Sequence, residues 1–235
     1  MKKLYIFSYG LYPWQLTLET LAAMRECGAV YSHCLDSQTV RQFLKIVPGL
    51  NLIAGMDSDA AVLAATQGLE KYDVVGFLTY GNPLFLNRSA TELAAAAGKK
   101  AEVTVFAAVS SFDALINLFN LNSFSTRGLR LVDTASSLEQ HDFTPDIDTL
   151  FFVPYALNRP GNAAAKKKFI AAAARAYPES AQVYLADCAS VVCRSPKVVK
   201  STMRGFSMLL SGLNERHTLF IPAVAPKPKR KTGKK

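Results

Sequence analysis

Short apolar segments alternate with amphipathic segments along the first half of the chain. The apolar segments have the length and composition of buried strands and lie at Leu4–Phe7, Ala29–His33, Val74–Leu78 and Glu102–Val105. Helical periodicity marks the stretches between them, at Leu16–Cys27, Ser37–Ile46, Ser58–Tyr72 and Ser89–Ala97. Strands that alternate with helices of this length are typical of βαβ units on a mainly parallel sheet. The pattern therefore predicts an α/β fold for this half.

The pattern changes after about Ala107. A helix is predicted over Ser111–Phe119, because Ser110 or Ser111 can cap it and Asp113 suits its first turn. Beyond it strands outnumber helices: strands are predicted at Leu129–Val132, Thr149–Val153, Gln182–Asp187, Val191–Cys193 and His217–Ile221, and one helix at Ala163–Ala176. We therefore expect an N-terminal α/β domain at residues 1–107, a C-terminal α+β domain with a mixed sheet at 108–223, and a disordered basic tail at 224–235.

Composition indicates a folded chain outside the membrane. Half of the 235 residues are hydrophobic and 19% are charged, which allows a sizeable core. No apolar run reaches the roughly 18–20 residues that a bilayer requires. The apolar start of the chain is interrupted by Ser8 and Gly10, and no small-residue cleavage site follows. We therefore expect a cytoplasmic protein without a membrane partner. The spacing of the four cysteines matches no zinc site, so we expect reduced thiols and no bound metal. These cysteines are Cys27, Cys34, Cys188 and Cys193.

Most of the net charge lies at the carboxyl end. The formal net charge is +9, and removing the six positive charges of Pro226–Lys235 leaves about +3 for the rest of the chain. Such a tail is expected to be disordered, and either attracts nucleic acid or an acidic partner or only aids solubility. The body of the chain does not interleave basic and stacking aromatic residues. Nucleic acid is therefore an alternative partner that we do not favour.

Two strands of the first half run into loops rich in aromatic residues, glycine and proline. Val74–Leu78 is followed by Tyr80–Phe85, and Leu4–Phe7 is followed by Ser8–Pro13. Ligands of open α/β folds bind beyond the carboxyl ends of the strands. The two loops therefore predict a small-molecule crevice at this edge of the sheet.

Three segments resemble the tetrapyrrole methylase superfamily, whose members use S-adenosylmethionine and share the class III methyltransferase fold. Leu4–Glu19 is similar to the opening strand, glycine-rich loop and "LTL" helix start of that family. Val75–Asn87 is similar to its strand and "GDP" loop, here as Tyr-Gly-Asn-Pro, and Phe106–Asp113 is similar to its "PG-[IV]-S-S/A" junction. The chain departs from the family pattern where Ser8 replaces the first glycine and Ala107-Ala108 replaces Pro-Gly.

The resemblance implies a cofactor, a site and an assembly. S-adenosylmethionine is the implied cofactor, no metal is implied, and the family is expected to form homodimers. The implied cofactor-binding residues are Gly10, Tyr80, Gly81, Asn82, Pro83, Leu84, Phe85, Ala108, Val109 and Ser110. Tyr80 and Tyr12 are the candidate catalytic residues, because a phenol can orient substrate or cofactor, although either ring can equally serve in packing. Asp36 is a weaker candidate, either a general base or a helix cap.

The form of the Tyr80–Asn87 loop, together with Leu-Thr-Leu-Glu-x-Leu at the opening helix, resembles the borosin-type peptide backbone N-methyltransferases. Those enzymes are expected to carry tyrosines and an arginine in the region corresponding to 49–67, which here contains neither. The implied function is methylation of a peptide, including a backbone amide of a separate precursor, or of a small molecule. The alternatives are a nucleic-acid-directed methyltransferase and a non-catalytic binding protein, which Ser8 and Ala108 would favour.

Overall fold

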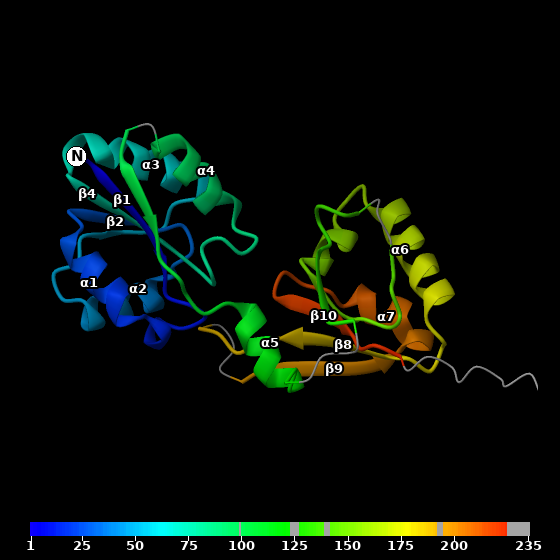
Figure 1. The fold of residues 1–235 in the computed structure, drawn as a ribbon. Coiled ribbons are helices and arrows are strands. Elements are labelled where there is room, and N and C mark those ends of the chain that lie inside the picture. Colours follow the sequence, from blue (N-terminus) through cyan, green and yellow to red (C-terminus); the bar gives the residue numbers. More distant parts are fainter. Residues whose placement is uncertain (99, 123–126, 139–141, 192–194, 225–235) are drawn as a thin grey trace, which may run out of the picture. The chain divides into compact units, whose positions relative to one another are not determined.

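The computed structural model describes the chain except for residues 99, 123–126, 139–141, 192–194 and 225–235. The chain divides into two compact units (Figure 1). The first comprises Met1–Ala114 and Ala189–Arg194, and the second comprises Leu115–Cys188 and Ser195–Lys235. The division that we expected after residue 107 falls inside the first unit, and almost all of the expected basic tail lies outside the described residues.

The first unit is built on a parallel five-stranded sheet with the strand order β3-β2-β4-β1-β5. Its strands are β1 (Lys3–Ser8), β2 (Ala29–Tyr31), β3 (Leu52–Ile53), β4 (Val74–Thr79) and β5 (Glu102–Val105). Its helices are the 3-10 turn η1 (Pro13–Gln15), α1 (Leu18–Glu26), α2 (Ser37–Ile46), α3 (Ser58–Lys71), α4 (Arg88–Ala97) and the start of α5 (Ser111–Phe119). Because every pairing is parallel, the carboxyl ends of all five strands meet at one edge.

Helices cover both faces of this sheet (Figure 1). On one face Ile6 and Phe77 belong to the core that includes Leu93 of α4 and residues of α3. On the other face Phe7 belongs to the core that includes Phe43 of α2 and residues of α1. Strands that are buried on both faces are expected to read as continuous apolar runs rather than as an alternation. This explains why the first half of the chain predicts parallel strands.

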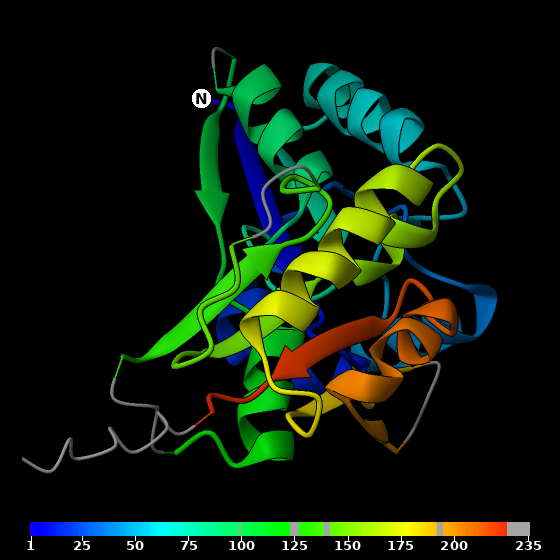
Figure 2. The ribbon, with the colours of Figure 1, turned by 90° about the vertical axis from the view of Figure 1, so that its right-hand side faces the viewer.

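The second unit contains a mixed sheet with the order β6-β7-β10-β8-β9, in which β6 and β7 are parallel and the other neighbours antiparallel. Its strands are β6 (Leu129–Asp133), β7 (Asp148–Phe152), β8 (Gln182–Asp187), β9 (Lys197–Thr202) and β10 (His217–Ile221). Its helices are η2 (Pro154–Asn158), α6 (Ala163–Ala176), η3 (Met203–Gly205) and α7 (Phe206–Ser211). Residues of α6 and α7 share one core with β7, β8 and β10, and Figure 2 shows both helices beside the red strand β10.

The structure confirms the predicted fold class, an α/β unit followed by a unit with a mixed sheet. It also corrects the predicted strand at Val191–Cys193: Val191 lies in no strand, and Cys193 lies outside the described residues. The reason is that Val191 packs against the core of the first unit, and its N–H donates to the carbonyl of Leu11 at 3.1 Å. Among the described elements, the strands β3 and β9, the helix α7 and the short 3-10 helices η1, η2 and η3 were not predicted.

Among the described residues, no helix combines the length and the apolar character needed to cross a membrane.

Candidate functional site

The loops after β1 and β4 are joined at two glycines. The N–H of Gly81 donates to the carbonyl of Gly10 at 3.0 Å. Both residues are in the left-handed region, with φ of +70° and +68°, a conformation that glycine adopts without steric cost. The hydroxyl of Ser8 accepts the N–H of Gly10 at 3.0 Å. Ser8 is thus accommodated as part of the loop's own hydrogen bonding, at a position where the family usually has glycine.

Asn82 connects the β4–α4 loop to the segment between β5 and α5. Its side-chain nitrogen donates to the carbonyl of Ala108 at 3.4 Å, and its Oδ1 accepts the N–H of Leu84 at 3.0 Å. At the far end of the same loop Asn87 caps α4 through Ala90 N–H, and its amide donates to Thr79 Oγ1 at 2.6 Å. Side chains therefore fix this loop at both ends.

The start of α5 is fixed by a reciprocal cap. Ser110 Oγ accepts the N–H of Phe112 at 3.1 Å, while Asp113 Oδ2 accepts the N–H and the O–H of Ser110 at 2.7 and 2.8 Å. Such an arrangement satisfies backbone donors that the first turn of a helix leaves unpaired. Of the two predicted caps, Ser110 and Ser111, Ser110 is the one that caps the helix, and the prediction of Asp113 as a first-turn charge is confirmed.

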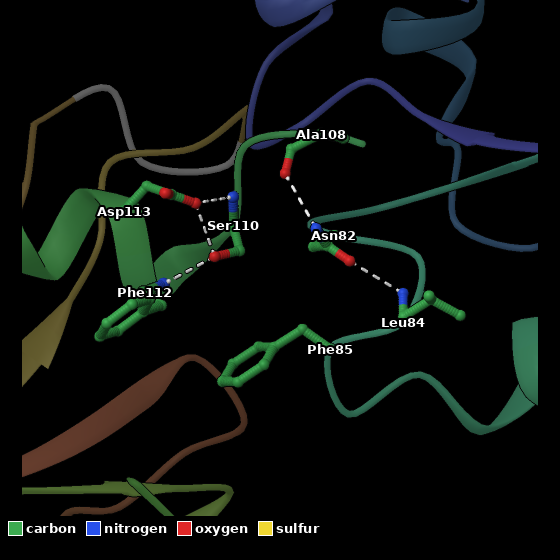
Figure 3. A pocket seen from close by; sticks show the side chains of 7 residues that line it. All are labelled: Asn82, Leu84, Phe85, Ala108, Ser110, Phe112 and Asp113. Carbon is green, nitrogen blue, oxygen red and sulfur yellow. Dashed lines mark hydrogen bonds between the residues drawn. The ribbon is translucent and has the colours of Figure 1, made fainter. Parts of the chain in front are cut away.

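These loops border an open cavity of about 330 Å³ within the first unit (Figure 3). Its size falls at the lower end of the range of about 300–1,000 Å³ that is usual for small-molecule sites. The rings of Phe85 and Phe112 lie 6.4 Å apart between centroids and supply aromatic surface. The cavity is lined by Asn82, Leu84, Phe85, Ala108, Ser110, Phe112 and Asp113.

The structure brings together part of the predicted cofactor-binding set. The predicted residues that line the cavity are Asn82, Leu84, Phe85, Ala108 and Ser110. Other members of the set lie in the adjoining loops but do not line it, namely Gly10, Tyr80, Gly81, Pro83 and Val109. The backbone of Ala108 is not left-handed, so the alanine at this position is unstrained. The cofactor-binding roles themselves stay predictions.

The candidate catalytic tyrosines lie outside the cavity lining. Tyr80 is 40% exposed, and its ring packs against that of Tyr9 at 5.9 Å between centroids. Tyr12 lies at the start of η1, where its N–H donates to Gln15 Oε1 at 3.3 Å. Tyr9 is buried, and burial raises the pKa of its phenol, which therefore stays protonated at neutral pH. Catalytic roles for Tyr80 and Tyr12 stay predictions.

The structure also shows the surroundings of Asp36 and of His33, two other polar residues at this edge. Asp36 caps α2, and the N–H groups of Thr39 and Gln38 that donate to it hold the pKa of the carboxyl below its ordinary value. A helix cap is therefore the better interpretation of Asp36 than a general base. The ring of His33 stacks on Phe77 at 5.6 Å, and burial lowers the pKa of the imidazole.

Sequence reasoning did not include Phe112 and Asp113 among the residues of the site. Both line the cavity because α5 begins six residues after β5 ends at Val105, so its first turn lies at the same edge of the sheet as the β4–α4 loop. The pattern of serine and aspartate at the start of the helix predicted a cap. This pattern did not predict that the capping residues also line a cavity.

Comparisons with known proteins extend the resemblance seen in the sequence. The model of the family "Tetrapyrrole (Corrin/Porphyrin) Methylases" matches residues 3–191. A search of curated proteins returned no match. Among solved structures, uroporphyrin-III-C-methyltransferase from Thermus thermophilus is 17% identical, with a TM-score of 0.68 over 94% of this chain and 92% of that chain.

Two further solved structures share the fold. The cobalt precorrin-4 methyltransferase CbiF is 16% identical, with a TM-score of 0.64 over 94% of each chain. The methyltransferase CobJ is 13% identical, with a TM-score of 0.63 over 96% of this chain and 95% of that chain. The family match covers most of the chain, including both loops of the site. The chain belongs to the tetrapyrrole methylases, a family of enzymes that take their methyl group from S-adenosylmethionine.

Proposed function

We propose that this chain transfers a methyl group from S-adenosylmethionine to a peptide or a small molecule, with the donor held in the cavity that Asn82 and Ala108 border. One observation carries the proposal. In a member of this family, the β4–α4 loop and the segment before α5 are tied together around a cavity at the carboxyl edge of a parallel sheet. Open α/β sheets bind their ligands at this edge.

The lining of the cavity fits an amphipathic donor. Phe85, Phe112 and Leu84 offer aromatic and aliphatic surface, and Asn82, Ser110 and Asp113 add a few polar groups. Mostly apolar walls with a small number of placed polar groups are typical of cofactor sites. When bound, S-adenosylmethionine supplies an electrophilic methyl group on a positively charged sulfur.

The contribution of the protein to such a transfer is the placement of the reactants. Asn82 holds the β4–α4 loop, and the cap at Ser110 and Asp113 holds the start of α5, so the two walls of the cavity are fixed by side-chain hydrogen bonds. Holding reactants in a productive geometry supplies a large part of the rate of a bimolecular step. Tyr80, which is partly exposed beside this loop, is the residue we propose to orient the acceptor.

A peptide is the acceptor that we favour, delivered by a separate chain. Support comes from the Tyr-Gly-Asn-Pro form of the β4–α4 loop, which resembles the borosin-type enzymes. Small molecules, including tetrapyrrole-like rings, are the second class, because the similar solved structures are named for such substrates. We also propose a cytoplasmic homodimer, as expected from the resemblance.

The test is transfer of a labelled methyl group. The purified chain is incubated with methyl-labelled S-adenosylmethionine and, in separate reactions, with a peptide extract or uroporphyrinogen III. Label is expected in the peptide fraction. It should be lost in Ala108→Phe, which fills the cavity, and kept in Ala107→Phe, the same change at the exposed neighbour outside the lining. Donor binding without label in either acceptor class would instead indicate a non-catalytic binding protein.

A further inference from the structure

A single carboxylate lies among the residues that line the cavity. Among the described residues that line the cavity, Asp113 is the only charged one and none is basic (Figure 3). Its Oδ2 accepts both hydrogen bonds from Ser110. Within the described part of the chain no donor reaches its Oδ1, so one oxygen of the carboxylate remains available to a ligand.

Two of the three polar hydrogens on the described lining side chains are bonded within the protein. The hydroxyl of Ser110 donates to Asp113, and one hydrogen of the Asn82 amide donates to the carbonyl of Ala108. The carboxylate of Asp113 gives the described lining a negative charge. Phe85 and Phe112 add aromatic faces, whose quadrupole also attracts cations. Both features favour a positively charged ligand and disfavour an anionic one.

We infer that the cavity recognises the positive charge of the methyl donor, with Asp113 as its counter-ion. This inference rests on the proposed function, because it assumes that the donor occupies this cavity. The donor carries two cationic groups, the sulfonium at the reacting sulfur and the ammonium of its amino-acid end. Either cationic group can pair with the carboxylate. Three related ligands, which differ in the cationic groups that they carry, distinguish these two pairings. S-Adenosylmethionine carries both cations, S-adenosylhomocysteine only the ammonium, and 5′-methylthioadenosine neither.

The variant Asp113→Asn removes the charge and keeps a side-chain oxygen that can accept from Ser110, so the start of α5 is preserved. Asp59→Asn is the matched control, because Asp59 is an exposed acid in the first turn of α3 that does not line the cavity. Dissociation constants of the three ligands are measured by calorimetry on the full chain. Because Asp113 is exposed, an ion pair with it predicts a loss of about two- to fivefold for a cationic ligand.

The pattern across the three ligands decides the outcome. A greater loss for S-adenosylmethionine than for S-adenosylhomocysteine in Asp113→Asn assigns the carboxylate to the sulfonium. An equal loss for these two, with 5′-methylthioadenosine unchanged, assigns it to the ammonium. An equal change for all three ligands, or no change relative to Asp59→Asn, overturns the inference while leaving donor binding intact. Failure of the native chain to bind any of the three overturns the proposed function as well.

Discussion

At the scale of single residues, Asn82 fixes the cavity more directly than any other lining residue. Replacement by leucine, which has a similar shape, removes the bonds to Ala108 and Leu84. The bond to Ala108 is partly buried and the bond to Leu84 is exposed. Since one hydrogen bond contributes about 0.5–1.5 kcal/mol, we expect Asn82→Leu to lower stability by about 1 kcal/mol. We also expect at least about tenfold weaker binding of S-adenosylhomocysteine, since preorganisation of the loop is lost.

Asn51→Leu provides the matched control for this prediction. The side chain of Asn51 also donates to a backbone carbonyl in the first unit, that of Gly28 at 2.9 Å, but it does not line the cavity. Asn51→Leu should therefore lower stability without changing affinity for the ligand. Equal affinities in the two variants would show that Asn82 has no role in placing the ligand.

His33 predicts a dependence of stability on pH. Its Nδ1 is buried without a partner among the described residues, and burial lowers the pKa of the ring below the ordinary value of about 6.5. The unfolded chain therefore binds the proton more readily, so the contribution of His33 to stability is complete above about pH 6.5 and falls as the pH drops toward the lowered pKa.

The measurement is the midpoint of thermal unfolding between pH 7.5 and 5.0. His33→Phe preserves the stacking on Phe77 and removes the titration, so the midpoint should fall less with acid than in the native chain. Some dependence is expected to remain, because burial also lowers the pKa of His217. An identical slope in the variant and the native chain would be inconsistent with this account of His33.

At the scale of elements, the close approach of β4 to its neighbours depends on Gly76. A Cβ at this position would lie 2.6 Å from the ring of Phe7 and 2.8 Å from a methyl group of Val30. Overpacking of a core costs about 1–3 kcal/mol, so Gly76→Ala should lower the free energy of unfolding by about that amount in urea. Gly98→Ala is the control, because Gly98 is exposed, has right-handed backbone and should change stability by at most about 0.5 kcal/mol. Equal effects of the two substitutions would contradict this packing.

The elements that the sequence predicts well are those with strong local signals. The predicted bounds of α2, α5 and α6 agree with the structure because capping residues or turns mark their ends. In contrast, β9 was not predicted because the first four residues of this edge strand are exposed and show no apolar alternation. The strand β3 contains only two residues, too few for a periodic pattern.

The same contrast applies to the candidate site. The loops after β1 and β4 were predicted because glycine and proline interrupt apolar runs there, and five residues of the predicted set line the cavity. The bond from Asn82 to Ala108 joins residues 26 positions apart, and the sequence holds no local sign of it. For the same reason Asp113 was interpreted only as a residue of a helix start.

At the scale of the whole molecule, fold class follows from local patterns and strand order does not. Alternation of strands and helices predicts a parallel sheet. The placement of β1 between β4 and β5 depends on pairing between residues about 70 and 100 positions apart along the chain, which no local signal specifies. Each unit nonetheless has its own hydrophobic core.

The basic carboxyl end gives a prediction for the full chain. Pro226–Lys235 carries six of the positive charges, and the described residues that line the cavity all lie between Asn82 and Asp113. Deletion of 226–235 should therefore leave the affinity for S-adenosylhomocysteine unchanged and weaken only salt-sensitive association with polyanions. Loss of affinity for S-adenosylhomocysteine on deletion would contradict this prediction.

Binding of the methyl donor in the cavity of the first unit is tested most directly by calorimetric titration of S-adenosylhomocysteine into the native chain, Ala108→Phe and Ala107→Phe. Saturable binding is expected for the native chain and for Ala107→Phe. In Ala108→Phe the new ring obstructs the space beside Phe85 and Phe112, so binding should weaken by at least about tenfold. Equal binding by all three proteins would contradict a donor site in this cavity.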